Sequence, residues 1–372
     1  MIIPIDGVVK DYAWGRPGAL SHVLQRKVSD GVEAEWWLGA HPLGPSTSME
    51  SGVSVATVLA EGGHPPLGFL LKILTPGSPL SLQVHPSTEQ AQSGFDREDR
   101  AGIPLDDPTR HYKDPSAKPE LVVAWGGPFH ALAGIAPRDT VLERLRCLEV
   151  AGVAPSSLAP WRERLERGVE EAISWLLRGG QEVRALLHQL GLFRTHSEIV
   201  QRLWEHYPED PGIAVALMLN RVTLNPGESL FLDAGQLHAY LEGTAIELMA
   251  PSDNVLRGGL TPKNVDVDEL LAIADCRSAE PPYLHPIDHG GGWWEWAPPA
   301  QAFALHCLEH SAHSRSVSLR GPAIALSLGG ESVVREGSTT VTIPPGGAVL
   351  AADMRVLEVD SVGHHLWVAT AG

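Results

Sequence analysis

The sequence predicts a mainly β protein that is interrupted by a helical segment. Of its 372 residues, 38 are glycine and 30 are proline, which suits short strands joined by many turns. Apolar residues recur with the period of a strand in residues 1–137 and again beyond residue 293. Between residues 138 and 207 they recur with the period of an amphipathic helix. The length favours two or three domains over a single core.

One stretch of the first region, Leu80–Pro86, alternates apolar and polar residues and therefore predicts a strand with one buried face. Gln83 and His85 stand two residues apart on its polar face, so both side chains point the same way. Ser87 follows, with Gln90 three residues later, and this pair predicts the capping box of a helix.

The helical region has apolar residues at helical spacing in four segments: 140–146, 161–177, 183–190 and 197–204. We expect an inserted helical domain of about seventy residues there. A further short helix is expected at 266–274, and a Pro- and Gly-rich passage at 281–292 is the best candidate for a linker. Short apolar runs at strand spacing follow at 303–308, 317–319, 323–328, 341–343 and 366–369, and they predict a small all-β sandwich or barrel.

The chain has a formal net charge of −17, which argues against nucleic acid and anionic membranes as partners. An anionic substrate would have to be met by a local group of Lys and Arg side chains. Cys147, Cys276 and Cys307 are too few and too far apart to predict a disulfide framework or a Cys-based zinc site. Neither a signal peptide nor a membrane-spanning stretch is apparent, so we expect a cytoplasmic protein.

Polar side chains stand two residues apart at three places with strand character: the pairs are Gln83/His85, Lys118/Glu120 and His238/Tyr240. A β-barrel could bring the three strands around one cavity. Two imidazoles, one carboxylate and one amide oxygen would suit Zn²⁺, with water at an open position. Spacing alone does not prove that the strands converge, and a lone histidine on a strand is more often a surface or hydrogen-bonded core residue.

Other charged residues have an ordinary and a functional interpretation. Lys72 lies inside an apolar strand, where a lysine usually extends its head group to solvent or protects a sheet edge. Beside a metal cavity it could instead contact a substrate. Asp253, Arg257 and Lys263 fall in a segment broken by Gly and Pro, which without further context predicts a solvated surface loop.

Several motifs resemble those of the type I mannose-6-phosphate isomerases, also called phosphomannose isomerases, of the cupin superfamily. They occur in the family's order over about residues 10–265: Tyr12–Gly15, Glu35–Gly39, Leu80–Pro86, Tyr112–Glu120, Gly235–Tyr240 and Ser252–Lys263. The resemblance implies two cupin-like jelly-roll β-domains plus an α-helical domain. A catalytic cupin domain with the metal site would comprise residues 1–137 and 214–285. Residues 138–213 would form the helical insertion, and residues 286–372 a cupin-like domain without metal.

The resemblance also implies roles for individual residues. One zinc ion per chain would be held by Gln83, His85, Glu120 and His238. Catalytic roles would fall on Arg257, Glu247, Lys118, Asp253 and Tyr240. Substrate-binding roles would fall on Trp14, Ser81, Lys72, Thr261 and Lys263.

The implied activity is the interconversion of mannose 6-phosphate and fructose 6-phosphate through a cis-enediol intermediate. The zinc ion would act as a Lewis acid, and the proton would be moved by a carboxylate, with Glu247 as first choice, or by a metal-bound hydroxide. Lys118 and Asp253 could shuttle protons during ring opening. Arg257 and Lys263 would clamp the substrate phosphate.

Two other functions stay open from the sequence. An Fe(II) cupin oxygenase would typically use more histidine ligands, and Gln83 in place of an imidazole argues against it. A non-catalytic sugar-phosphate-binding cupin would keep Arg257 but tolerate a broken metal set, whereas all four positions are filled here. The expected partner is a small-molecule sugar phosphate, with neither nucleic acid nor membrane, and the expected oligomeric state is a monomer.

Overall fold

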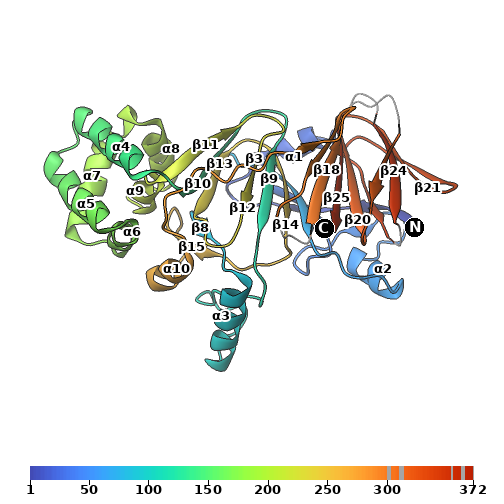
Figure 1. Cartoon of the computed structure of the whole chain (residues 1–372), viewed down its shortest axis with the longest axis horizontal. Helices are drawn as coiled ribbons and strands as arrows, with labels where there is room; N and C mark the ends of the chain where they lie inside the picture. The colour runs from blue at the N-terminus through green and yellow to red at the C-terminus, as the bar shows by residue number, and fades with distance from the viewer. Residues whose placement is uncertain (300–302, 310–313, 353–354, 362–364, 372) are drawn as a thin grey trace.

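The computed structural model describes residues 1–299, 303–309, 314–352, 355–361 and 365–371. Over these residues the chain is mainly β, as the sequence predicts, with its strands in five sheets. Figure 1 shows the order along the long axis: helices α4 to α9 at one end, two packed sheets in the middle, and the strands from the last part of the chain at the other end.

The two middle sheets form a sandwich, which we call the central sandwich. Its six-stranded sheet has the order β12 (Ser229–Leu232), β9 (Glu120–Ala124), β14 (Ala245–Met249), β7 (Leu70–Leu74), β5 (Glu35–Gly39) and β2 (Val8–Lys10). Its five-stranded sheet has the order β11 (Leu219–Leu224), β10 (Phe129–Ile135), β13 (His238–Glu242), β8 (Gln83–Val84) and β15 (Leu256–Arg257). Buried side chains of both sheets, among them Val122, Phe129 and Tyr240, pack together between them.

Strand β8 is shorter than the sequence predicts, because its backbone partners change along Leu80–His85. The Leu80 N–H donates to the carbonyl of Tyr240, whereas the Leu82 N–H donates to the carbonyl of Gly259. Only Gln83 and Val84 pair in regular register, with β13 on one side and β15 on the other. The segment is nevertheless hydrogen-bonded along its length and lies between two strands.

The last part of the chain adds a second pair of sheets. The eight-stranded sheet has the order β16 (Ile287–Asp288), β17 (Trp293–Trp296), β18 (Phe303–Leu308), β25 (His365–Ala371), β20 (Ala323–Leu328), β23 (Ala348–Ala351), β1 (Ile2–Asp6) and β6 (Thr47–Ser48). The four-stranded sheet has the order β19 (Arg315–Ser318), β24 (Val356–Ser361), β21 (Ser332–Glu336) and β22 (Thr339–Ile343). A two-stranded sheet joins β3 (Arg16–Pro17) to β4 (Val32–Glu33).

The six-stranded sheet is buried on both faces. Alternate residues such as Leu71, Leu121 and Leu248 face away from the five-stranded sheet and pack against Leu305 and Leu326 of the eight-stranded sheet. The first strand, β1, belongs to that eight-stranded sheet, where it pairs with β23. The six-stranded sheet of the central sandwich and the eight-stranded sheet therefore share one continuous apolar layer.

The helices follow one another between β10 and β11: α4 (Arg138–Val150), α5 (Pro155–Arg167), α6 (Val169–Arg178), α7 (Gln181–Leu192), η1 (Arg194–His196), α8 (Glu198–His206) and α9 (Gly212–Ala216). The single helix predicted over 161–177 is wrong. It is divided at Gly168, whose φ of 154° lies where residues with side chains are rarely found. Apolar residues recur at helical spacing on both sides of Gly168, so this pattern does not indicate the break between the two helices.

Four further helices are α1 (Ala19–Val23), α2 (Val55–Glu61), α3 (Thr88–Arg100) and α10 (Val267–Ile273). The first two are exceptions to the strands and turns predicted for residues 1–137. The capping box of α3 is confirmed, because Ser87 Oγ accepts from the Gln90 N–H and the Gln90 side chain accepts from the Ser87 N–H. Within the described residues, no helix combines the length and the apolar character needed to span a membrane.

Candidate functional site

The strands of the central sandwich bring three buried metal-binding side chains together. His238 begins β13 and His85 follows β8 in the five-stranded sheet, while Glu120 begins β9 in the opposite sheet. Glu120 Oε1 lies 3.3 Å from His85 Nε2, and Glu120 Oε2 lies 3.5 Å from His238 Nε2. One donor atom from each residue lies within 4.8 Å of the other two, so the three can share one ion.

The hydrogen bonds of both imidazoles leave the ligating nitrogen available. His85 Nδ1 lies 2.7 Å from the backbone oxygen of Asn254, and His238 Nδ1 lies 2.9 Å from that of Gln236. A carbonyl can only accept, so each Nδ1 carries the proton and each Nε2 presents a lone pair toward Glu120. His85 Nε2 is buried without a hydrogen-bond partner, as expected of a metal-ligating nitrogen. The donor set therefore fits a zinc ion.

The protonation states of this set also suit a metal. Burial, followed by the charge of Lys118, lowers the pKa of His85 to about 4, so its imidazole is neutral near pH 7. Burial alone would raise the pKa of Glu120, but Lys118 and the two histidines outweigh it, and that pKa lies well below its usual range. Lys118 Nζ lies 2.8 Å from Glu120 Oε1, and the Tyr240 hydroxyl donates to Glu120 Oε2 at 3.3 Å.

Gln83 stands in one row with a ligand candidate and a cation of the five-stranded sheet. Its Cα is paired with that of His238 on one side and with that of Arg257 on the other. Directly paired residues of an antiparallel sheet project to the same face, so the three side chains follow one another across it. The structure thus places Gln83 between the histidine set and Arg257.

A buried group of charges covers the neighbouring part of the six-stranded sheet. Lys72 Nζ lies 2.9 Å from Glu247 Oε2 and 3.6 Å from Glu35 Oε2, and the Trp37 indole N–H donates to Glu35. Burial would lower the pKa of Lys72, but the two carboxylates raise it overall, so the ammonium is charged. Burial raises the pKa of Glu247 despite Lys72. Glu247 is only 2% exposed.

Beside the histidine set is a pocket of about 460 Å³ that Asp253, Arg257 and Lys263 line together. The pKa of Lys263 is lowered first by the charge of Arg257 and then by burial, which means that the two cations are neighbours. Among the described residues, neither cation has a carboxylate within ion-pair distance. Such a pair in a chain of net charge −17 is suited to a ligand anion.

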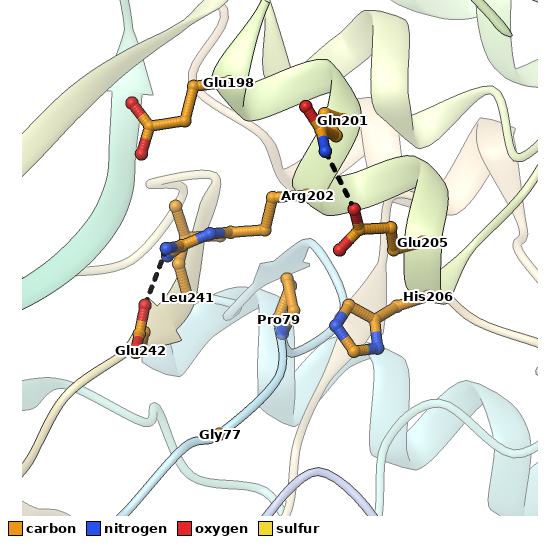
Figure 2. A pocket seen from close by; sticks show the side chains of 9 residues that line it. All are labelled: Gly77, Pro79, Glu198, Gln201, Arg202, Glu205, His206, Leu241 and Glu242. Atoms are coloured by element: carbon orange, nitrogen blue, oxygen red, sulfur yellow. Dashed lines mark hydrogen bonds and ion pairs between the residues drawn. The ribbon is translucent and has the colours of Figure 1, made fainter. Parts of the chain in front are cut away.

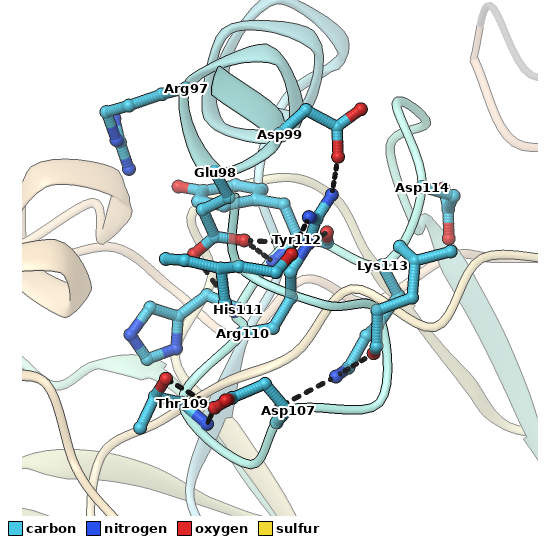
Figure 3. Close-up of polar contacts among 12 residues, drawn as sticks. Arg97, Glu98, Asp99, Asp107, Thr109, Arg110, His111, Tyr112, Lys113 and Asp114 are labelled. Atoms are coloured by element: carbon cyan, nitrogen blue, oxygen red, sulfur yellow. Dashed lines mark hydrogen bonds and ion pairs between the residues drawn. The ribbon is translucent and has the colours of Figure 1, made fainter. Parts of the chain in front are cut away.

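One wall of this pocket is a loop that follows α3, and a buried arginine organises it (Figure 3). Arg110 donates to the backbone oxygens of Ile103 and Tyr112 and to Asp99. Glu98 lies 3.3 Å from Arg110 and accepts from the backbone N–H groups of His111 and Tyr112. The loop opposite Arg257 therefore has a fixed conformation.

Three of the other predicted substrate-binding residues, Thr261, Ser81 and Trp14, are not among the residues that line this pocket. Thr261 is half-buried, and its backbone N–H donates to Asp210, a residue of the helical region that also accepts from the Leu260 N–H. Ser81 is half-buried beside the backbone pairing of Leu82 with Gly259. Trp14 stacks on Tyr12 with ring centroids 5.8 Å apart. Within the described residues, neither the Trp14 nor the Ser81 side chain forms a hydrogen bond with the histidine set.

Sequence reasoning missed Glu35, Tyr12 and Asn254 as parts of this site. Burial, followed by the charge of Glu35, raises the pKa of Tyr12, so its hydroxyl is influenced by the charges around Lys72. Asn254 is fully buried and accepts from the backbone N–H groups of Lys113 and Asp114, while its own carbonyl holds His85. The motif Ser252-Asp-Asn254 was visible in the sequence, but a role exerted through a backbone oxygen leaves no residue-type signal.

A separate pocket of about 380 Å³ lies between α8 and the end of β13 (Figure 2). Its charged lining is mainly acidic: Arg202 pairs with Glu242 at 2.6 Å, Glu205 accepts from Gln201, and Glu198 is a further carboxylate. None of the predicted site residues lines it. The chemistry of the site therefore belongs to the central sandwich.

Fold and site together define a class: a β-sandwich protein with a candidate metal centre between its sheets and, beside it, a pocket that holds Arg257 and Lys263. A family model described as phosphomannose isomerase type I, catalytic domain, matches residues 2–138. The chain is 34% identical to mannose-6-phosphate isomerases of Escherichia coli (strain K12) and Shigella flexneri, over 95% of its own length and 96% of theirs. It therefore belongs to the type I phosphomannose isomerase family.

Solved structures of similar proteins agree with this assignment. Zinc-bound mannose 6-phosphate isomerase superposes with a TM-score of 0.89 at 32% identity, covering 100% of this chain and 99% of that one. The Salmonella typhimurium enzyme bound to its substrate fructose 6-phosphate and zinc superposes equally well, with the same identity and coverage. Because the whole chain is covered, the likeness extends to the helices and to the C-terminal sheets.

Proposed function

We propose that this chain interconverts mannose 6-phosphate and fructose 6-phosphate. The observation that carries the proposal is the buried set His85, Glu120 and His238 beside the pocket of Arg257 and Lys263, in a member of this family. The set offers a metal site and the pocket offers an anion site. A sugar phosphate needs both at once, because its reacting carbons and its phosphate lie at opposite ends.

The metal site would consist of His85, Glu120 and His238, with Gln83 as the fourth residue. When bound there, zinc would supply Lewis-acid polarisation of the sugar oxygens. The chain prepares the site in two ways. The backbone oxygens that hold both Nδ1 atoms fix the imidazole orientation, and Lys118 keeps Glu120 ionised.

Arg257 and Lys263 would bind the phosphate. The guanidinium of Arg257 offers two parallel N–H donors to phosphate oxygens, and Lys263 adds a point charge. Thr261 and Ser81 stay predicted hydroxyl donors to the phosphate, and Lys72 and Trp14 stay predicted contacts of the sugar. Asp210 keeps the backbone of Leu260 and Thr261 in place, so the phosphate loop is braced by the helical region.

Ring opening needs one group that accepts a proton and one that donates a proton. Asp253 would accept the proton of the anomeric hydroxyl, whose oxygen becomes the carbonyl. Lys118 would donate a proton to the ring oxygen, which keeps the electron pair of the breaking carbon–oxygen bond. The Asp253 side chain is 41% exposed at the pocket, and its pKa is lowered although burial opposes this, so it is an ionised acceptor.

Isomerisation then moves a proton between C1 and C2 through the cis-enediol. Glu247 remains the proposed base because burial raises its pKa toward neutrality. Its ion pair with Lys72 at 2.9 Å would have to open for contact with carbon. Tyr240, hydrogen-bonded to Glu120, would help to hold that carboxylate.

A coupled assay that detects fructose 6-phosphate formed from mannose 6-phosphate tests the proposal. Turnover should disappear with a strong chelator and return with added zinc. A zinc-loaded protein that forms no fructose 6-phosphate would contradict it and would revive the non-catalytic sugar-phosphate-binding alternative. Turnover of either sugar phosphate with consumption of oxygen would instead favour the Fe(II) oxygenase.

We further propose the two-cupin arrangement, with residues 1–137 and 214–285 as the catalytic domain, 138–213 as the helical insertion and 286–372 as a domain without metal. Strands β1 and β6 of the first segment pair within the eight-stranded sheet of the last segment. Part of the last segment, including Asp353 and Met354, lies outside the described residues. A monomer is the proposed state, because every proposed site residue comes from one chain. The cytoplasm is the proposed compartment, in keeping with three unpaired thiols.

A further inference from the structure

The segment that follows β5, Gly39–Pro42, carries a buried histidine that the proposed chemistry does not use. His41 is 4% exposed, and its ring lies edge-on to Trp37 with centroids 5.0 Å apart. A buried histidine ordinarily satisfies both nitrogens with neighbouring backbone groups. Here only one nitrogen does so, and the other faces a carboxylate from a distant part of the chain.

The tautomer of His41 follows from its first partner. The backbone N–H of Leu43 donates to His41 Nδ1 at 3.2 Å, so this nitrogen presents a lone pair. The ring proton must then be on Nε2. That nitrogen lies 3.4 Å from Asp253 Oδ2, which is the carboxylate that shares the pocket with Arg257 and Lys263.

The hydrogen bond between Asp253 and Asp114 involves only the main chain of Asp253. Its backbone N–H donates to Asp114 Oδ2 at 2.9 Å, which fixes the main chain but leaves the carboxylate free to rotate. The other charged groups that influence it are Lys118 and Lys72, whose effects are weaker than that of His41. His41 is therefore the group that can decide where the carboxylate oxygens point.

We propose that His41 is a positioning residue for Asp253. Its Nε2, 3.4 Å from Oδ2, would donate to that oxygen and leave the other oxygen of the carboxylate for the substrate hydroxyl. The packing on Trp37 and the bond from Leu43 give the imidazole a single orientation, so Asp253 is preorganised before the sugar binds. This inference rests on the proposed function, in which Asp253 accepts a proton during ring opening.

A double-mutant cycle tests the inference. His41→Phe keeps the ring on Trp37 but removes the donor, and we expect it to lower kcat about tenfold or more, with KM and zinc content close to wild type. His41→Gln returns an N–H near the position of Nε2 and should recover most of the loss. In an Asp253→Asn background, His41→Phe should cost little more, because both changes act on one group. His64→Phe, on the wall of the pocket behind His41, is the matched control and should have no effect.

Three kinetic outcomes would overturn the inference: an unchanged kcat in His41→Phe, a failure of His41→Gln to restore activity, or an equal loss in both backgrounds. If the wild-type chain does not turn over sugar phosphate, the proposed function fails first, and NMR still decides the geometry. In ¹⁵N-histidine-labelled protein, His41 should carry its proton on Nε2, and that resonance should shift in Asp253→Asn. A proton on Nδ1 would contradict the positioning role, and so would an Nε2 chemical shift that is the same in Asp253→Asn as in the wild type.

Discussion

Glu120 shows how much of the site depends on single atoms. Its Oε1 is shared by His85 and Lys118, while its Oε2 faces His238 and Tyr240. Each carboxylate oxygen therefore has both an imidazole and a proton donor within reach. A residue of this kind cannot be replaced without changing both the charge and the geometry of the set.

We expect His238→Ala to lose zinc and isomerase activity together, because only His85, Glu120 and Gln83 would remain as ligands. Elemental analysis and the coupled assay measure the two losses on the same sample. His188→Ala, at an exposed position of α7, should keep both. Full zinc content in His238→Ala would mean that the ligand set is a different one.

Arg257→Ala should lower kcat/KM by about tenfold or more while zinc content stays unchanged, because a charge-assisted bond to phosphate contributes about 1.5–3 kcal/mol. Inhibition by inorganic phosphate should weaken in parallel. Arg277→Ala removes an exposed arginine that pairs with Asp275, and it serves as the control. Wild-type kcat/KM together with wild-type phosphate inhibition in Arg257→Ala would move the phosphate site to Lys72 and Lys118.

The residue types of the site were available from the sequence, but their convergence was not. The i, i+2 pairs put Gln83 with His85 on one face, since a strand has a period of two. Nothing local to those strands says that Glu120, from the opposite sheet, lies 3.3 Å from His85. The roles of His41 and Asn254 were even harder to predict. His41 contacts Asp253, which lies in a distant loop, and Asn254 holds His85 through its backbone oxygen.

At the scale of elements, prediction succeeded where burial is uniform. The continuous apolar runs 303–308 and 323–328 correspond to β18 and β20, which are buried along their whole length. Strand β21, with an arginine and a glutamate among its five residues, was missed because half of it is solvated. Short strands with mixed faces carry little local signal, and the pairing that stabilises them comes from distant segments.

The capping box of α3 gives an element-scale prediction. Ser87→Ala removes the acceptor for the Gln90 N–H at the start of the helix between His85 and the pocket wall. We expect the free energy of unfolding to fall by about 1 kcal/mol. Urea denaturation of this variant, beside Ser156→Ala at an exposed position of α5, measures it. If Ser87→Ala costs no more stability than Ser156→Ala, tertiary contacts rather than the cap stabilise the N-terminus of α3.

At the scale of the whole molecule, the stability of the metal-free protein should depend on pH through His85. Its pKa is lowered from 6.5 to about 4, so between these values the unfolded chain binds a proton that the folded protein does not. The free energy of unfolding should therefore fall as the pH drops through this window, by on the order of 3 kcal/mol in total. The stabilisation from the lowered pKa of Glu120 is lost only at more acidic pH.

Urea denaturation of chelator-treated protein at several pH values between 7.5 and 4.5 measures this dependence. In His85→Gln the same slope should be much flatter, since the titrating group is gone. A slope equal to that of the wild type would assign the effect to other histidines. Bound zinc should leave this slope in place and extend it below pH 4, because the folded chain then keeps the ligand nitrogen unprotonated while the unfolded chain still takes up the proton.

The position of β1 has a consequence for the order in which the molecule is completed. Ile2–Asp6 pairs with β23, whose residues 348–351 are synthesised much later than β1. At about 5–20 residues per second, this strand waits on the order of tens of seconds for its partner. The eight-stranded sheet, and with it the outer face of the six-stranded sheet, cannot close until residues 348–351 have left the ribosome. A nascent chain that still lacks β23 therefore presents β1 without this partner, and a chain that contains β23 covers it.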